Sequence, residues 1–200
     1  MALIDKYRNA FEQNCFRLII EAYNNCLTEK VIRPDWNEND ISYELYEKME
    51  NNSANITQYQ IHISPNSPIP KDVIKIKGFA DKLPRPDLIM SHFAIKQKFK
   101  CFFEAKRLKE KDTDLKRAYI SEGMDRFIRN KYPMIGCMLG YLMEGKPDET
   151  RKGINSLLKK DNRDTEALHA KPNILFQFYY ESNHSQIGIL KHLIFDFTTL

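Results

Sequence analysis

Glu104 and Lys106 stand two residues apart at the end of an apolar segment, residues 99–106. The aromatic residues of this segment favour a β-strand. Side chains alternate between the two faces of a strand, so this acid and this lysine should point to the same face. The opposite face should be buried, and it carries Phe99, Cys101, Phe103 and Ala105.

A second carboxylate, Asp87, precedes Glu104 by 17 residues, in another apolar stretch, residues 86–90. If the two segments pair as a hairpin, Asp87 lies opposite Glu104. Two carboxylates bind a hard divalent cation such as Mg²⁺ (or Mn²⁺), and the carbonyl of Ala105 is placed to join them. Such a metal polarises a phosphoryl oxygen and lowers the pKa of a bound water, which Lys106 could orient or deprotonate. The spacing therefore predicts metal-assisted phosphodiester hydrolysis by Asp87, Glu104 and Lys106.

The same three residues also have a purely structural interpretation. A glutamate and a lysine two residues apart occur by chance in many chains, and they can form an ion pair on a solvated strand face. Asp87 would then be a turn residue after Pro86. The two interpretations differ in whether the carboxylates of Asp87 and Glu104 lie within reach of one metal.

The surrounding pattern predicts the elements that would position these residues. Helical spacing of apolar residues predicts helices over 5–28 and 38–49 (with Asn37 as N-cap), and the composition of 108–131 and 146–160 is compatible with two more helices. Strand-like composition is found in seven segments: 55–64, 73–76, 86–90, 99–106, 134–143, 173–181 and 187–197. This order predicts an α/β domain in which helices flank a mixed central β-sheet.

Pro86-Asp87 and Glu104-Ala105-Lys106 resemble the motif of the PD-(D/E)xK nuclease superfamily, and the match spans roughly residues 38–143. The resemblance implies a restriction-endonuclease-like fold and Mg²⁺-dependent DNA cleavage, with Asp87 and Glu104 as metal ligands and Lys106 as the catalytic lysine. One nuclease-like domain is expected over residues 1–200. Its parts would be N-terminal helices (1–52), a catalytic core (53–145) and a C-terminal helix and strands (146–200).

Many members of that superfamily add an acid from a helix before the first core strand. The candidates here are Glu21, Glu38, Glu44 and Glu47. We favour Glu44 because it neighbours the apolar face that should pack on the sheet, and Glu38 comes second.

Basic and aromatic residues near the motif could contact a nucleic acid. By closeness in the chain, Lys100, Arg107 and Arg126 are the candidates for phosphate contacts. They could equally belong to solvated faces balanced by neighbouring acids. Tyr119 and Tyr132 could stack on or hydrogen-bond to the substrate, although such aromatic residues more often pack at the edge of a core.

Composition and the absence of other catalytic motifs limit the other classes of protein to which the chain could belong. The chain of 200 residues has 31 basic and 27 acidic residues, a net charge of +4 that permits a nucleic-acid partner without requiring one. The four cysteines form no CxxC pair, which indicates buried thiols in a cytoplasmic protein. The longest apolar run, residues 134–143, is too short to span a membrane. We find no P-loop, no Gly-x-Ser-x-Gly elbow and no paired histidine motif.

The sequence thus favours a DNA endonuclease or exonuclease, with RNA a less favoured substrate because no aromatic RNA-binding signature is found. By analogy with similar lone nuclease domains, it would serve a prokaryotic restriction or antiphage defence system, as a homodimer or with a partner ATPase or sensor subunit. The alternative is a catalytically inactive nuclease-fold subunit that binds nucleic acid or assembles a complex.

Overall fold

The inner strand β3 (Gln97–Lys109) has buried residues on both of its faces in a computed structural model that describes residues 3–70, 77, 79–94, 97–129, 132 and 136–199. Cys101, Phe103 and Ala105 belong to one hydrophobic cluster. Phe102 and Leu108 belong to a second cluster on the other face. The predicted alternation of side chains along this strand is therefore confirmed.

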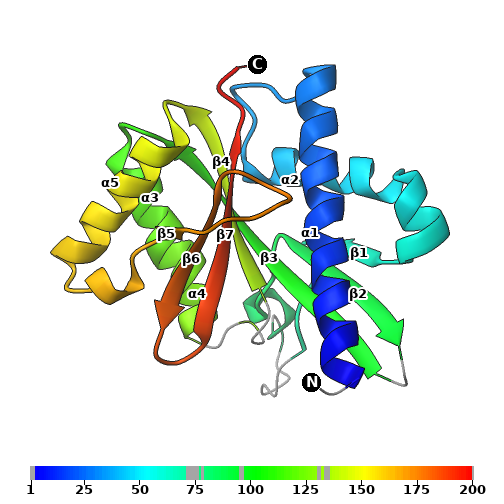
Figure 1. The fold of residues 1–200 in the computed structure, drawn as a ribbon. Coiled ribbons are helices and arrows are strands. Elements are labelled where there is room, and N and C mark those ends of the chain that lie inside the picture. The colour runs from blue at the N-terminus through cyan, green and yellow to red at the C-terminus, as the bar shows by residue number, and fades with distance from the viewer. Residues whose placement is uncertain are drawn as a thin grey trace.

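Within the described residues, β3 lies in a mixed seven-stranded sheet with the order β1-β2-β3-β4-β7-β6-β5 (Figure 1). β2 runs antiparallel to β3, as the predicted hairpin required, whereas β4 runs parallel to both β3 and β7. The predicted α/β class with a mixed sheet is confirmed. The remaining strands are β1 (His62–Pro65), β2 (Leu88–Ala94), β4 (Gly136–Glu144), β5 (His169–Ala170), β6 (Tyr179–His184) and β7 (Gly188–Asp196).

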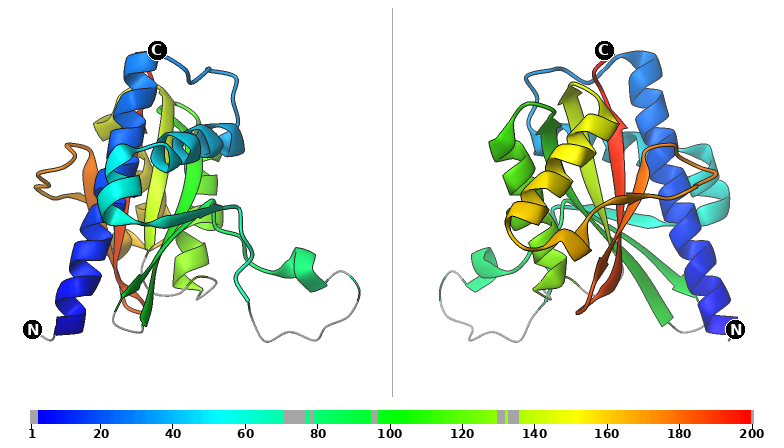
Figure 2. Two further views of the ribbon diagram at one scale, coloured as in Figure 1. Left: turned by 90° about the vertical axis from the view of Figure 1, so that its right-hand side faces the viewer. Right: turned by 60° about the vertical axis from the view of Figure 1, so that its left-hand side comes forward.

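Helices cover both faces of the sheet (Figures 1 and 2). α1 (Leu3–Glu29) and α2 (Glu38–Glu50) pack on the face that contains Phe103, and Tyr23 of α1 stacks on Phe195 of β7 with ring centroids 4.5 Å apart. The other face is covered by the crossover between β3 and β4 and by a later helix. These elements are α3 (Thr113–Ala118), η3 (Tyr119–Met124), α4 (Asp125–Ile128) and α5 (Pro147–Lys160). Among the described residues, no helix is long and apolar enough to cross a membrane.

The start of α2 is fixed by its own sequence. The Asn37 side chain accepts hydrogen bonds from the N–H groups of Asn39 (2.8 Å) and Asp40 (3.1 Å), and Asp40 accepts the N–H of Asn37 (3.0 Å). This reciprocal capping satisfies N–H groups that have no partner inside the helix. The predicted N-cap is confirmed, and Glu38 becomes the first helical residue.

Some predicted boundaries were wrong. Residues 55–64 do not form one strand, because the Asn55 amide bonds the N–H and carbonyl of Ile61 and holds the π-helix η1 (Asn55–Tyr59) before β1. The predicted helix over residues 108–131 begins only at Thr113, after its N-cap Asp112. β6 begins at Tyr179 rather than at 173. The predicted strand at 73–76 lies outside the described residues.

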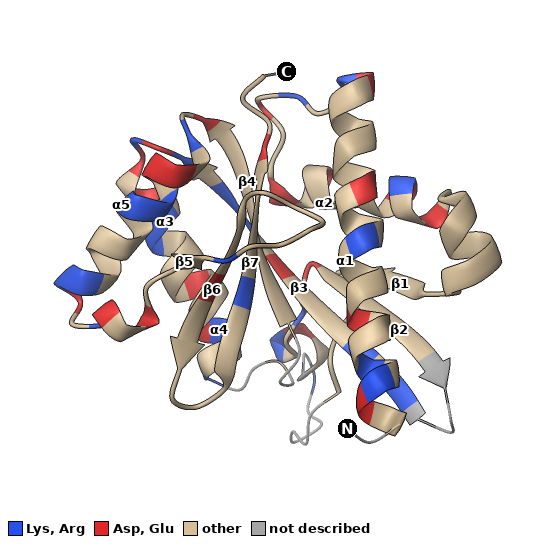
Figure 3. Cartoon of the chain, in the orientation of Figure 1, with Lys and Arg blue, Asp and Glu red and all other residues tan. Residues whose placement is uncertain are grey.

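Two short 3-10 helices complete the described elements: η2 (Phe79–Lys82) precedes β2, and η4 (Asp164–Glu166) follows α5. Figure 3 shows charged residues on the helices and loops and also along β3. Two charged residues of β3, Glu104 and Lys106, are buried, with exposed fractions of 0% and 7%.

Candidate active site

The end of strand β2 gathers two of the acids. The last β2–β3 pair is Leu88 with Phe103, but β3 continues to Lys109. Beyond that pair, the β2 side of β3 has N–H groups at alternate residues without a strand partner. Asp87 accepts the N–H of Ala105 at 2.6 Å, and Glu38 accepts the N–H of Arg107 at 2.9 Å. Two carboxylates thus take the place of the missing strand.

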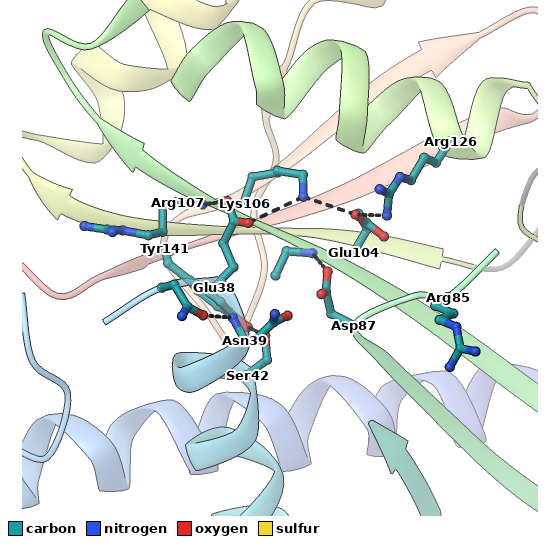
Figure 4. Close-up of polar contacts among 12 residues, drawn as sticks. Glu38, Asn39, Ser42, Arg85, Asp87, Glu104, Lys106, Arg107, Arg126 and Tyr141 are labelled. Atoms are coloured by element: carbon teal, nitrogen blue, oxygen red, sulfur yellow. Dashed lines mark hydrogen bonds and ion pairs between the residues drawn. The ribbon is translucent and has the colours of Figure 1, made fainter. Parts of the chain in front are cut away.

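Glu104 and Lys106 project from β3 toward the same space. The ammonium nitrogen of Lys106 lies 3.4 Å from Oε1 of Glu104 and 3.7 Å from Oε2 of Glu38. Figure 4 shows Asp87 beside this group, with its carboxylate turned toward the backbone of β3. The hairpin and the strand alternation therefore bring the three predicted catalytic residues together.

Both oxygens of the Glu104 carboxylate have hydrogen-bond donors. Arg126 of α4 donates to Oε1 at 2.6 Å, and the hydroxyl of Tyr132 donates to Oε2 at 2.5 Å. The Tyr132 ring lies nearly parallel to Phe102 (6° between planes) and edge-on to Phe127. The tyrosine is thereby fixed by packing, and it orients the acid.

Burial sets the electrostatics of the two central acids. It raises the pKa of Glu104 to about 7, and the negative charge of Asp87 adds to that rise. Burial also raises the pKa of Asp87, against the hydrogen bond from Ala105. Two buried carboxylates that disfavour each other's charge are stabilised by a nearby cation.

These residues line a pocket of about 590 Å³. Its walls carry three acids and four basic residues, so the pocket offers donors to an anion and oxygen ligands to a cation in one space. The lining residues are Glu38, Asn39, Asn66, Lys82, Leu83, Pro84, Arg85, Asp87, Glu104, Lys106, Arg126 and Tyr132.

The donor set fits one kind of metal site and not another. In the part of the chain that the structure describes, no three His, Cys, Asp or Glu side chains are grouped so that they could hold a metal. A closed site made only of protein ligands is therefore not formed by these residues. Mg²⁺ commonly uses one or two carboxylates together with waters and substrate phosphates. Asp87 and Glu104 fit that open type of site, and Glu104 would have to exchange a present partner for the metal.

The helix acid in the pocket is Glu38 and not the favoured Glu44. Glu44 lies 3.6 Å from Lys48 on the same helix and is absent from the pocket lining. Six residues along a helix turn a side chain well away from the starting direction, because one turn takes 3.6 residues. The preference for Glu44 is corrected accordingly.

Of the four predicted nucleic-acid contacts, only Arg126 lines the pocket. Tyr119 is fully buried and bonds Nδ1 of His192 at 2.9 Å, so it cannot touch a nucleic acid in this structure. The guanidinium of Arg107 donates to the carbonyl of Pro34, outside the pocket lining. Lys100 shares the strand face of Glu104 but does not line the pocket either.

Lys82, Arg85, Asn39 and Asn66 were not predicted as site residues, yet they line the pocket. Lys82 and Arg85 precede β2 in a segment without regular hydrophobic spacing, so no periodic signal could have identified them. Asn66 is recognisable only through the fold, since its N–H bonds the carbonyl of Asp87 at 3.0 Å.

Comparisons of the chain with models of protein families, with curated proteins and with solved structures find no match. The residues of the pocket are therefore the basis for a functional proposal.

Proposed function

We propose that the chain is a metal-dependent nuclease that hydrolyses phosphodiester bonds in DNA, on a restriction-endonuclease-like core. The observation that carries the proposal is that Asp87, Glu104 and Lys106 line one pocket, with Glu38 beside them. Two acids that can share a cation, next to a lysine, are suited to metal-assisted hydrolysis of a phosphodiester.

Each residue would have a distinct role. Asp87 and Glu104, with the Ala105 carbonyl, would hold Mg²⁺ or Mn²⁺, which when bound supplies charge stabilisation and an acidified water. Lys106 lies between two carboxylates and keeps its ammonium in the pocket. From there it would orient the attacking water and offset the negative charge that develops on the phosphorus-bound oxygens.

The basic residues of the pocket support a polyanionic substrate. Lys82, Arg85 and Arg126 border the same space as the acids. Such side chains bind backbone phosphates without reading bases. Tyr132 is the one aromatic residue of the described lining, and it is 3% exposed and already bonded to Glu104. It offers no stacking platform for unpaired bases, which favours a duplex over a single-stranded substrate.

A second candidate is a nuclease-fold subunit that binds nucleic acid without cutting it. It is favoured by the occupation of both Glu104 oxygens by Arg126 and Tyr132. A carboxylate held in this way contributes to structure, and the basic residues alone could bind phosphates.

Cleavage assays separate the two candidates. The purified chain is incubated with plasmid, linear duplex DNA, single-stranded DNA and RNA in Mg²⁺, in Mn²⁺ and in EDTA. We expect metal-dependent cleavage of DNA that falls by about 100-fold or more in Lys106→Met and in Glu104→Gln. Circular dichroism confirms that both variants are folded.

The matched control is Lys109→Met. Lys109 is another lysine of β3, but it pairs with Glu144 at 3.5 Å and does not line the pocket. Full activity in this variant is expected. Nucleic-acid binding without cleavage under every condition would favour the second candidate, and cleavage that survives Lys106→Met would contradict the assigned role of that lysine.

The proposal extends to the oligomeric state of the nuclease and to the partner that would control it. A homodimer would bring two sites to the two strands of a duplex. A partner ATPase or sensor subunit, as in prokaryotic restriction or antiphage systems, would confine cutting to the correct target. Assays that combine the chain with candidate partners test this extension.

A further inference from the structure

Arg126 connects the open part of the pocket to a buried acid. Its side chain is 33% exposed, whereas the side chain of Glu104 is 0% exposed. The guanidinium nitrogen Nη1 lies 2.6 Å from Oε1 of Glu104. Oε1 is also the oxygen nearer to Lys106, at 3.4 Å. The oxygen that faces the catalytic lysine is thus the one that Arg126 covers.

We propose that Arg126 is a positioning residue with two alternative partners, an inference that rests on the proposed nuclease function. In the free protein it holds Oε1 of Glu104 and also donates to the hydroxyl of Tyr132 at 3.1 Å. A phosphate group of the nucleic acid that enters the pocket binds Arg126 instead, and Oε1 then becomes available to a divalent cation. Nucleic acid and cation therefore bind cooperatively.

The chemistry of the guanidinium supports the exchange. Arginine presents five N–H donors in a planar fork that matches both carboxylate and phosphate geometry. Its partial exposure lets a phosphate approach the group without prior opening of the core. A buried carboxylate that loses one cationic partner is strongly destabilised. Glu104 therefore releases Arg126 at low cost only when another cation takes its place, and this couples the two binding events.

The backbone that carries Arg126 is held while the side chain changes partner. The neighbouring residue Asp125 is 7% exposed and bonds Arg163 at 2.8 Å and Arg129 at 3.0 Å. The bond to Arg163 ties the short helix α4 to η4, because Arg163 also bonds Glu166. The exchange is therefore a side-chain movement and does not require α4 to shift.

Tyr132, in contrast to the partly exposed Arg126, is held in place by its neighbours. It is 3% exposed, and Phe102 and Phe127 pack against its ring. Its hydroxyl keeps its bond to Oε2 and so holds the plane of the Glu104 carboxylate in both states. The structure thus assigns Oε2 to the scaffold and Oε1 to the cation.

Binding measurements test the exchange without relying on activity. Free Mn²⁺ is measured by electron paramagnetic resonance in titrations of the protein, with and without a phosphorothioate DNA oligonucleotide, after subtraction of Mn²⁺ bound by the oligonucleotide alone. Coupling between two ligands commonly changes affinity by about 5- to 150-fold. We expect the oligonucleotide to tighten Mn²⁺ binding to the wild type by a factor in that range.

Variants of Arg126 give the decisive comparison. Arg126→Gln should bind Mn²⁺ tightly without the oligonucleotide and should show no further gain when it is added. Arg126→Lys keeps a cation and should retain part of the coupling. Arg117→Gln is the control, because Arg117 is 40% exposed and does not line the pocket. It should behave as the wild type does.

The possible failures are distinguishable. If the wild type binds Mn²⁺ and Arg126→Gln shows the same affinity and the same coupling, the exchange is overturned while the nuclease proposal stands. If no protein binds Mn²⁺, even with the oligonucleotide, the metal site itself is overturned and both proposals fall.

Discussion

Asp87 accepts a hydrogen bond from the backbone N–H of Ala105 at 2.6 Å. The bond lies just beyond the last β2–β3 pair, where an antiparallel strand would otherwise have supplied the acceptor. The same carboxylate also raises the pKa of Glu104 through its charge, after the larger effect of burial. Asp87 therefore has a structural role at the edge of the sheet and an electrostatic role in the pocket, and two substitutions can separate them.

Asp87→Asn and Asp87→Ala should have different stabilities and the same loss of function. Asparagine keeps a carbonyl acceptor for Ala105, so its free energy of unfolding should equal or exceed that of the wild type. Alanine leaves a buried N–H unpaired, at a cost of about 1–3 kcal/mol. Both variants lose the charge and should lose Mn²⁺ binding and cleavage. Urea unfolding compares the stabilities, and equal stability of the two variants would show that the Ala105 bond is energetically unimportant.

The part of the site that lies on β3 was predictable because strand alternation is a local property. Glu104 and Lys106 share a face whatever the rest of the chain does. Asp87 needed only the antiparallel pairing of adjacent segments, which the structure contains. These short-range relationships account for the predicted core of the site.

Residues that depend on long-range packing were harder to predict. Glu38 enters the pocket because capping by Asn37 and Asp40 starts α2 at that point and because the helix then crosses the end of β3. No rotation about the helix axis could be assigned from sequence alone. The burial of Tyr119 likewise depends on His192, a residue of the distant strand β7.

Glu38→Gln should reduce activity, and Glu44→Gln on the same helix should not. Glutamine keeps an acceptor for the N–H of Arg107 but removes the charge that lies 3.7 Å from Lys106. Loss of such a supporting carboxylate commonly costs about 10- to 100-fold in activity or metal affinity. Steady-state kcat/KM on DNA measures the effect. Equal activity of the two variants would remove Glu38 from the functional site.

The buried histidine of β7 predicts a pH dependence of stability. His192 is 0% exposed, and its ring bonds Tyr119 at 2.9 Å and Ser182 at 2.8 Å. Burial, with a smaller effect of His184, lowers the pKa of His192 from 6.5 to about 3. The unfolded chain therefore binds more protons than the folded one between these values. The contribution of His192 to stability is present above pH 6.5 and is lost as the pH falls, by up to about 1.4 kcal/mol per pH unit.

Glu104 acts in the opposite direction over an overlapping range. Its pKa is raised from 4.5 to about 7, so its contribution is present at low pH and is lost as the pH rises through that range. The dependence of stability on pH is therefore compared only between proteins that retain Glu104, so that its contribution is the same in each. As the pH is lowered from 6.5 to 4.5 in EDTA, the free energy of unfolding of the wild type should fall relative to that of His192→Gln. His169→Gln, a change at an exposed position of β5, should follow the wild type, and parallel curves for all three proteins would contradict the prediction.

Gly136→Ala should disturb the support of Glu104 from a distance. A Cβ at this position, the first residue of β4, would lie 2.0 Å from Cε1 of Phe127. That ring packs edge-on against Tyr132, with centroids 5.1 Å apart, and Tyr132 holds Oε2 of Glu104. Overpacking of this kind costs about 1–3 kcal/mol, so urea unfolding should show a loss of that size. Misplacement of Tyr132 should also weaken Mn²⁺ binding.

A second substitution tests whether the Phe127 ring transmits the effect. Leucine at position 127 is smaller than phenylalanine, so Phe127→Leu should make room for the added methyl group. The double variant should then lose less stability than the sum of the two single variants, because residues in contact are not additive. Its Mn²⁺ affinity should be closer to that of the wild type than the affinity of Gly136→Ala is. Strict additivity in both measurements would mean that Gly136 acts on the site by a route other than Phe127 and Tyr132.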